Sequence, residues 1–257
     1  MGLLNGKTYV VMGVANHRSI AWGIAQSLHE QGANLVFTYQ GERLKESVEK
    51  LINTLEGQQK VLVQCDVTSD DDVREAFNTI RESVGTIHGI AHCIAFAKKE
   101  DLQGEFIETS REGYHLAQDI SAYSLVAVAR EAKPLMTEGG SIVTLTYLGG
   151  ERVVKNYNVM GVAKAALDAN VKYLAKDLGK DNIRVNGVSA GPIRTLAAKG
   201  IGGFNEIIHQ IEDNAPLKRT VTQREVGDSA MFLLSDLSRG VTGEILHVDS
   251  GYNILGF

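Results

Sequence analysis

The sequence has few of the residues that mark disulfide, metal or membrane proteins. Two of its 257 residues are cysteine, three are proline and 6% are aromatic. Cys65 and Cys93 form no C-x-x-C or Cys/His metal spacing, so we expect reduced core thiols and no metal site. No apolar run approaches the roughly 18 residues of a membrane span, and the amino terminus lacks the hydrophobic stretch of a signal peptide. We therefore expect a cytoplasmic protein.

An excess of basic residues is also missing. Lys and Arg number 26 against 31 Asp and Glu, which gives a net charge of −5. Proteins that bind nucleic acid or anionic membranes neutralise phosphates with clustered cations, and no such cluster occurs here. The 44% hydrophobic content supports a substantial core, and no Pro/Gly/Ser-rich linker divides the chain. Residues 1–257 are therefore predicted to form a single domain.

Short apolar runs alternate with longer amphipathic ones along the whole chain. This alternation predicts an α/β fold, a Rossmann-like doubly wound parallel sheet of about seven strands with helices on both faces. The predicted strands are 7–12, 33–38, 60–65, 88–94, 141–147, 183–188 and 244–248. Capping-box spacing places helix starts at Ser69, Thr109 and Thr222. The helix predicted from Tyr157 to Leu178 is apolar on many sides, which favours a subunit interface and predicts a homo-oligomer, with a tetramer as the expected form.

Two residues on that helix, Tyr157 and Lys164, carry the strongest chemical signal. Two helical turns separate them, so a regular helix would place their side chains about 20° apart around the axis and about 10.5 Å apart along it. Short-chain dehydrogenases that act on alcohols place a Lys four residues after the Tyr, where this chain has Gly161. The wider separation weakens the effect of the Lys164 ammonium on the Tyr157 phenol, which suits a phenol that stabilises a developing enolate. A surface pair of Tyr and Lys is the plainer interpretation, but strand 141–147 ends at Tyr147, where open parallel sheets place their sites.

The first predicted strand leads into a loop suited to a pyrophosphate. Gly13 permits a tight turn, and the helix that follows offers its amino-terminal N–H groups to an anion. Ser19 could cap this helix or bond a phosphate oxygen. The spacing differs from G-x-G-x-x-G, so an ordinary strand-to-helix turn explains it as well.

Residues after the second and third strands bear on the choice of cofactor. Asp66 could accept from an adenine amino group while Val67 packs on the ring, and a turn role for Asp66 is equally open. Gln40 follows the second strand, with Glu42 and Arg43 close by. A 2′-phosphate would require cations at that point, so NADH is favoured over NADPH.

Together these motifs resemble the bacterial enoyl-acyl carrier protein reductases of type I, a branch of the short-chain dehydrogenase/reductase superfamily. The resemblance runs almost end to end and rests on GVANHRSIAWG (13–23), HCIAFA (92–97), LTYLGG (145–150), the segment 157–164, SAGPIRTL (189–196) and VDSG (248–251).

The resemblance implies NADH-dependent reduction of trans-2-enoyl-acyl carrier protein, the last step of the bacterial fatty acid elongation cycle. It implies the catalytic residues Tyr147, Tyr157 and Lys164. The cofactor site would be lined by Gly13, Ser19, Ile20, Gln40, Asp66, Val67, Ile94, Lys164, Ile193 and Thr195. The enoyl thioester would lie beside Ala95, Ala97 and Tyr157.

Residues 193–215 have no strong period and mix glycines with apolar residues, which predicts a substrate-binding lid. Some family members carry several basic residues here, where an acidic carrier protein could dock. This chain has only Lys199 between Arg194 and Lys218, which argues against docking by charge at this edge.

Two other functions fit parts of the pattern. A short-chain ketoreductase or alcohol dehydrogenase would share the fold, but Gly161 and Tyr147 depart from its expected Lys and Ser. A protein that senses NADH without turnover is the alternative from another class. Retention of Tyr147, Tyr157 and Lys164 together favours an enzyme.

Overall fold

Seven parallel strands form one sheet in the computed structural model, which describes residues 2–195 and 202–256. The strand order is β3-β2-β1-β4-β5-β6-β7. The strands are β1 (Thr8–Met12), β2 (Asn34–Tyr39), β3 (Lys60–Gln64), β4 (Gly89–His92), β5 (Gly140–Thr146), β6 (Ile183–Ala190) and β7 (Ile245–Val248). The predicted doubly wound α/β fold is confirmed, and each predicted strand is present.

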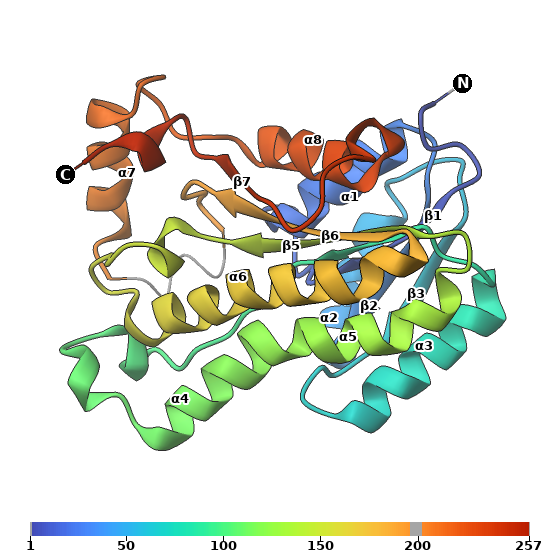
Figure 1. Cartoon of the computed structure of the whole chain (residues 1–257), viewed down its shortest axis with the longest axis horizontal. Coiled ribbons are helices and arrows are strands. Elements are labelled where there is room, and N and C mark those ends of the chain that lie inside the picture. Colours follow the sequence, from blue (N-terminus) through green and yellow to red (C-terminus); the bar gives the residue numbers. More distant parts are fainter. Residues whose placement is uncertain (1, 196–201, 257) are drawn as a thin grey trace.

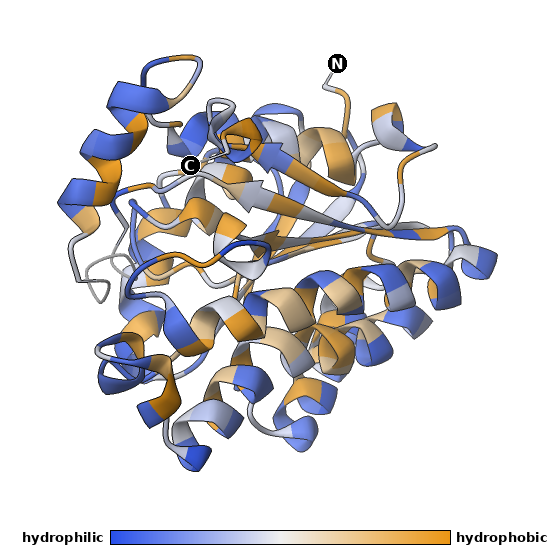
Figure 2. Cartoon of the chain, turned by 60° about the vertical axis from the view of Figure 1, so that its left-hand side comes forward, coloured by the Kyte–Doolittle hydropathy of each residue, from blue (hydrophilic) through white to orange (hydrophobic). Residues whose placement is uncertain are grey.

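Helices cover both faces of the sheet (Figure 1). They are α1 (Ile20–Glu30), α2 (Glu42–Ile52), α3 (Asp70–Val84), α4 (Arg111–Gln118), α5 (Ser124–Ala132), α6 (Asn158–Leu178), α7 (Phe204–Asn214) and α8 (Gln223–Leu234). Helices α1, α2 and α8 pack with the sheet in one hydrophobic cluster, and α3, α5 and α6 pack with it in another. Figure 2 shows hydrophobic residues along much of the sheet and hydrophilic residues interspersed with hydrophobic ones along the helices. No described helix is long and apolar enough to cross a membrane.

Two of the three predicted helix starts are confirmed. The Ser69 side chain accepts from the Asp72 N–H, and Thr222 forms a complete capping box with Glu225. The start at Thr109 is wrong by one residue, because Ser110 is the N-cap of α4 and accepts from the Gly113 N–H.

The structure also corrects the geometry predicted for Tyr157. This residue is the N-cap of α6, and the helix proper begins at Asn158. Asn158 has a φ of 33°, outside the helical region, so the angle and rise of a regular helix do not apply between Tyr157 and Lys164. An asparagine tolerates such a backbone, which the apolar pattern of the helix could not reveal.

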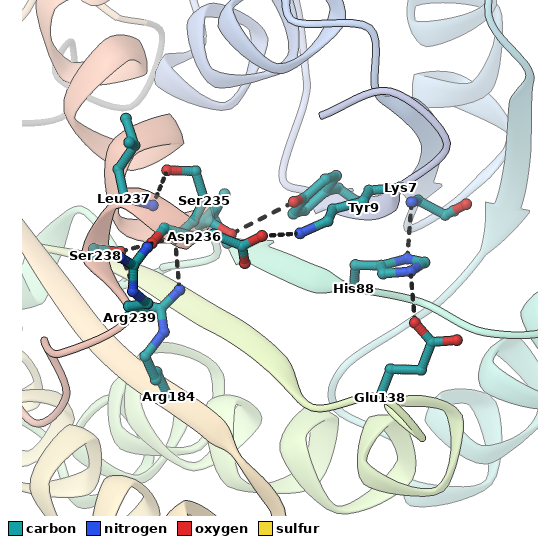
Figure 3. Close-up of polar contacts among 12 residues, drawn as sticks. Lys7, Tyr9, His88, Glu138, Arg184, Ser235, Asp236, Leu237, Ser238 and Arg239 are labelled. Carbon is teal, nitrogen blue, oxygen red and sulfur yellow. Dashed lines mark hydrogen bonds and ion pairs between the residues drawn. The ribbon is translucent and has the colours of Figure 1, made fainter. Parts of the chain in front are cut away.

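Polar side chains tie the amino ends of the strands to the end of α8 (Figure 3). The Arg184 guanidinium donates to the carbonyls of Leu233 and Ser235, at 2.8 and 2.9 Å. These carbonyls lie at the carboxyl end of α8, where a cation also complements the helix dipole. Lys7 pairs with Asp236 at 2.6 Å in the same region. This end of the sheet is therefore fixed, and the opposite end carries the candidate site.

Candidate active site

The strand order reverses between β1 and β4, which opens a crevice at the carboxyl ends of the strands. Gly13 follows β1 with a φ of 90°, and a Cβ added there would stand 2.1 Å from the Cys93 carbonyl oxygen. The loop after β1 therefore reaches the loop after β4 only because residue 13 has no side chain. This close approach shapes the floor of the crevice.

Ser19 organises the loop that leads into α1. Its hydroxyl accepts from the N–H groups of Ala15 and Asn16, at 3.0 and 3.1 Å, and does not cap the helix. The N–H groups of Ile20 and Ala21, in the first turn of α1, consequently have no side-chain cap, whereas those of Trp22 and Gly23 donate to the Ser19 carbonyl. Such a helix end binds a pyrophosphate well.

Asp66 and Gln40 lie side by side after β3 and β2. Gln40 Nε2 donates to Asp66 Oδ2 at 3.1 Å, and Asp66 Oδ1 accepts from the Thr68 N–H at 3.0 Å and the Thr68 hydroxyl at 2.8 Å. Burial opposes the charged form, but these hydrogen bonds outweigh it and lower the pKa of Asp66 below its usual value. The turn role predicted for Asp66 is thus present, and Val67 is buried beside it.

Tyr147 and Tyr157, the two predicted catalytic tyrosines, pack edge to face. The ring centroids of Tyr147 and Tyr157 are 5.0 Å apart at 74°. Burial raises the pKa of Tyr147 to about 12 and raises that of Tyr157 still further, with Tyr147 itself adding to the second effect. A Cβ at Gly149 would meet the Tyr157 ring at 2.4 Å, so this glycine makes room for the ring. Both phenols therefore stay protonated and can act as hydrogen-bond donors.

Gly161, at the position four after Tyr157, has a steric cause. A Cβ there would lie 2.8 Å from the Gly149 carbonyl oxygen, because the turn Leu148–Gly150 packs against α6. A lysine at residue 161 would require the backbone to move. The arrangement of Tyr and Lys used by alcohol dehydrogenases is thus disfavoured by packing.

Lys164 supplies the cation from one turn further along α6. Its side chain is buried, and Nζ donates to the Leu145 carbonyl at 2.7 Å. Burial lowers the pKa of Lys164 to about 8, while Asp168 favours the charged form. Burial in turn raises the pKa of Asp168. Asp168 was not predicted from the sequence, although its position one helical turn after Lys164 is a signal that could have found it.

The remaining predicted residues lie in loops at the same edge of the sheet. Ile94, Ala95 and Ala97 follow β4, and Ile193 and Thr195 follow β6. Ala97 and Tyr147 pack against the hydrophobic cluster that contains Tyr157. Ala97, Tyr147 and Tyr157 therefore share one apolar environment.

Another residue that was not assigned a role, His92, lies at the end of β4. Its Nδ1 is 3.0 Å from the Thr144 hydroxyl and its Nε2 is 2.9 Å from the Ser124 hydroxyl. Burial lowers its pKa to about 3, and the Lys164 charge adds to this effect. His92 is therefore neutral and joins β4, β5 and α5 beneath the site.

The predicted lid is described in part. Residues 196–201, including Leu196, Lys199 and Ile201, lie outside the described residues. Helix α7 follows them, and Ile208 and Ile211 are its buried residues. Asn156, in the loop before Tyr157, donates from Nδ2 to the Gly202 carbonyl at 2.7 Å. The loop before α6 thus contacts the segment that leads into α7.

A glycine-floored crevice, an open helix amino terminus and a buried Tyr and Lys define a dinucleotide-dependent oxidoreductase of the short-chain dehydrogenase class. A family model described as enoyl-(acyl carrier protein) reductase matches residues 13–253. The chain belongs to this family.

Relatives with closely similar sequences have names that differ in the cofactor. The chain is 69% identical over 256 residues to the enoyl-[acyl-carrier-protein] reductase [NADH] FabI of Bacillus cereus, covering all of both chains. It is 63% identical over 252 residues to the enoyl-[acyl-carrier-protein] reductase [NADPH] FabI of Staphylococcus aureus, covering 98% of each.

Solved structures agree with the fold along the whole chain. The Bacillus cereus enzyme with NADP+ and indole naphthyridinone has a TM-score of 0.98 at 69% identity and covers all of both chains. The Anaplasma phagocytophilum reductase in complex with NAD has a TM-score of 0.94 at 46% identity, over 100% of this chain and 95% of that one. Both nicotinamide cofactors occur among these relatives, so the preference of this chain has to be argued from its own residues.

Proposed function

We propose that the protein is an NADH-dependent enoyl-[acyl-carrier-protein] reductase. It reduces the double bond of trans-2-enoyl-acyl carrier protein to give acyl-acyl carrier protein, the last step of the bacterial fatty acid elongation cycle. The observation that carries this proposal is the buried contact of Tyr147 with Tyr157. It lies beside Gly161, where packing disfavours the lysine of alcohol dehydrogenases.

Tyr157 donates a hydrogen bond to the substrate, and Tyr147 shapes the pocket around it. Bound NADH supplies a hydride for the β-carbon of the enoyl thioester. Negative charge then develops on the thioester oxygen, and the Tyr157 hydroxyl donates a hydrogen bond to it from a site where water is excluded. Because burial raises the pKa of Tyr157, the phenol keeps its proton until that charge appears. Tyr147 shapes the pocket through its edge contact with the Tyr157 ring.

The cofactor site follows the crevice. Gly13, Ser19 and Ile20 would hold the pyrophosphate, and Asp66 and Val67 the adenine. Ile94, Ile193 and Thr195 would line the site beyond β4 and β6. Lys164 would bond the nicotinamide ribose hydroxyls and fix the ring over the substrate. Ala95 and Ala97 leave room for the thioester.

The residues after β2 support NADH over NADPH. Gln40 presents an amide, Glu42 carries a negative charge, and Gly41 has no side chain. A Cβ at Gly41 would meet no atom within 4 Å, and its φ of −164° suits any residue. Gln40→Arg with Gly41→Lys should therefore fold normally and shift the preference toward NADPH. Equal or higher wild-type efficiency with NADPH would overturn the assignment of NADH.

A direct test is oxidation of NADH by a crotonyl thioester, measured in parallel with oxidation of NADH by a ketone and reduction of NAD+ by an alcohol. Tyr157→Phe should lower kcat at least about tenfold, the usual effect of losing one oxyanion donor, and leave NADH affinity close to wild type. Tyr147→Phe is the matched control, because it keeps the ring contact and removes only the second hydroxyl. Unchanged turnover of Tyr157→Phe at saturating substrate would contradict the role.

The same measurements separate the alternative functions. A ketoreductase would turn over the ketone and not the crotonyl thioester. A protein that only senses NADH would bind the cofactor in a calorimetric titration and would turn over none of the three substrates. The packing at Gly161 disfavours the first of these.

We further propose that residues 1–257 act as one Rossmann-type domain, with a substrate-binding lid around residues 193–215, and that copies assemble as a homotetramer in the cytoplasm. Ala165, Ala169 and Tyr173 are exposed on α6 at intervals of four residues and so form an apolar stripe on one face, which supports an interface there. Light scattering that reports a monomer at micromolar concentration would contradict the tetramer.

A further inference from the structure

The side-chain amide of Gln40 has only one orientation that suits its neighbour. Asp66 is ionised at neutral pH, since its hydrogen bonds hold its pKa below even the usual acidic value of an aspartate, so its carboxylate oxygens accept hydrogen bonds and cannot donate them. The Gln40 amide must therefore turn its NH2 group toward Asp66 Oδ2, which is the 3.1 Å contact in the structure. The carbonyl oxygen of the amide, Oε1, is left on the other side.

Asp66 is itself held firmly. Its second oxygen, Oδ1, accepts two hydrogen bonds from Thr68, from the backbone N–H and the hydroxyl. The backbones that precede Gln40 and Asp66 are also hydrogen-bonded to each other, because the Cys65 N–H donates to the Tyr39 carbonyl at 2.8 Å, at the ends of β3 and β2. Gln40 is exposed, so the rest of its amide is available to a ligand.

We propose that Asp66 sets the choice between NADH and NADPH by fixing the orientation of the Gln40 amide. This inference rests on the proposed function, in which the adenosine ribose lies at the end of β2. The carbonyl oxygen of Gln40 accepts a hydrogen bond from a 2′-hydroxyl. A 2′-phosphate carries only acceptor oxygens and negative charge, and it meets an acceptor there with the Asp66 carboxylate behind it. Asp66 is thus a positioning residue that acts through Gln40.

Asp66→Asn tests this orientation sharply. The carbonyl oxygen of the introduced asparagine would keep the two hydrogen bonds from Thr68, which require an acceptor. The NH2 group of the new side chain would then face Gln40, and the Gln40 amide would have to turn over and present its own NH2 group outward. The position that accepted from a hydroxyl would become a donor that suits a phosphate.

The measurement is the ratio of kcat/KM with NADH to kcat/KM with NADPH, together with both dissociation constants by calorimetry. Contacts of Asp66 with adenine affect both cofactors equally and cancel in the ratio. Asp66→Asn should lower the ratio about tenfold or more, the effect of exchanging an acceptor for a donor at a charged group. Glu42→Gln removes a nearby negative charge but leaves the Gln40–Asp66 bond intact, and it should change the ratio less than about threefold, as expected for an exposed charge.

The decisive arm is a double-mutant cycle. In a Gln40→Leu background, Asp66→Asn should change the ratio less than about threefold, because no amide remains to be oriented and only the loss of a negative charge is left. An equal effect of Asp66→Asn with and without Gln40, or an effect matched by Glu42→Gln, would overturn the proposal in favour of simple charge. Wild-type protein that binds both cofactors but reduces no enoyl thioester would contradict the proposed function, while the binding ratios would still test the role of Asp66.

Discussion

The burial of His92 at the end of β4 links the stability of the protein to pH. The folded pKa is about 3, whereas histidine in an unfolded chain has a pKa near about 6.5. Below about pH 6.5 the unfolded chain therefore binds a proton that the folded chain rejects, and stability falls as the pH falls toward the folded value.

We expect His92→Gln to remove this dependence while it keeps polar contacts with Thr144 and Ser124. Urea unfolding of both proteins between about pH 7 and about pH 5 gives the comparison. The free energy of unfolding of wild type, relative to that of His92→Gln, should fall by about 1.4 kcal/mol for each pH unit below about 6.5. Parallel pH profiles would show that His92 can be protonated in the folded state, against the geometry of its site.

Unlike His92, which is buried in its neutral form, Lys164 is buried in its charged form, which burial makes unfavourable. Its folded pKa of about 8 lies below the value of about 10.5 expected in an unfolded chain, so the cost is full below pH 8 and disappears as the pH rises above about 10.5. Lys164→Met should raise the free energy of unfolding at neutral pH without cofactor by on the order of 1–2 kcal/mol, after loss of the bond to Leu145.

The same variant should bind NADH at least about tenfold more weakly, because its contact with the ribose hydroxyls is lost. Lys172→Met is the matched control, since this residue is exposed two turns further along α6 and should change neither quantity. A Lys164→Met protein that is less stable and binds NADH normally would contradict the assignment of Lys164 to the cofactor.

At the scale of the elements, the hydrogen bond from Asn156 to Gly202 connects the loop before α6 with the start of α7. Asn156 has a φ of 61°, which glycine adopts freely and alanine does not. Asn156→Gly should therefore remove the contact with the lid but keep the backbone, and Asn156→Ala should add strain. If the lid closes on substrate, Asn156→Gly should raise KM for a long-chain enoyl thioester about fivefold, the equivalent of one hydrogen bond.

Amide hydrogen exchange of α7 provides a second measurement for the same variant. Faster exchange at Ile208 and Ile211 in Asn156→Gly is expected with the higher KM. A wild-type KM for Asn156→Gly, together with unchanged exchange in α7, would show that Asn156 does not act on the predicted lid.

The sequence predicted the strands and most helices because their signals are local. Apolar runs located every strand, and the capping spacing located α3 and α8. It misplaced the start of α4, because Ser110 and Thr109 are both good caps, and in the fold Ser110 caps the helix while the Thr109 hydroxyl donates to the Phe106 carbonyl. It also extended α6 through Tyr157, because the positive φ of Asn158 leaves no trace in the apolar pattern.

The sequence singles out the candidate site residues but does not reveal their contacts. Tyr147, Tyr157, Lys164 and Gly13 stood out by position along the chain. The bond between Gln40 and Asp66 joins residues 26 apart and depends on the register of β2 with β3. The closeness of Gly161 to Gly149 depends likewise on how α6 packs on the turn after β5. Such tertiary distances cannot be read from spacing along one strand or helix.

At the scale of the whole molecule, the charge of the chain bears on how it meets its carrier protein. The net charge is −5, and the residues of α7 include Glu206, Glu212 and Asp213 but no Lys or Arg. Attraction of an acidic carrier toward this helix is therefore not expected. An attractive encounter weakens as salt screens it, whereas a neutral or repulsive encounter does not.

We expect kcat/KM for crotonyl-acyl carrier protein to stay constant or rise as the salt concentration increases from about 20 to about 200 mM, a range over which the screening length shortens about threefold. Crotonyl-pantetheine, which is uncharged, is the control for salt effects on the enzyme and on NADH. Glu206→Lys with Glu212→Lys should raise kcat/KM for the carrier substrate at low salt, leave crotonyl-pantetheine unchanged, and lose its advantage at high salt. If wild-type kcat/KM for the carrier substrate falls severalfold over this range while that for crotonyl-pantetheine holds, the carrier docks through cations elsewhere on the surface, and the charge of α7 does not govern the encounter.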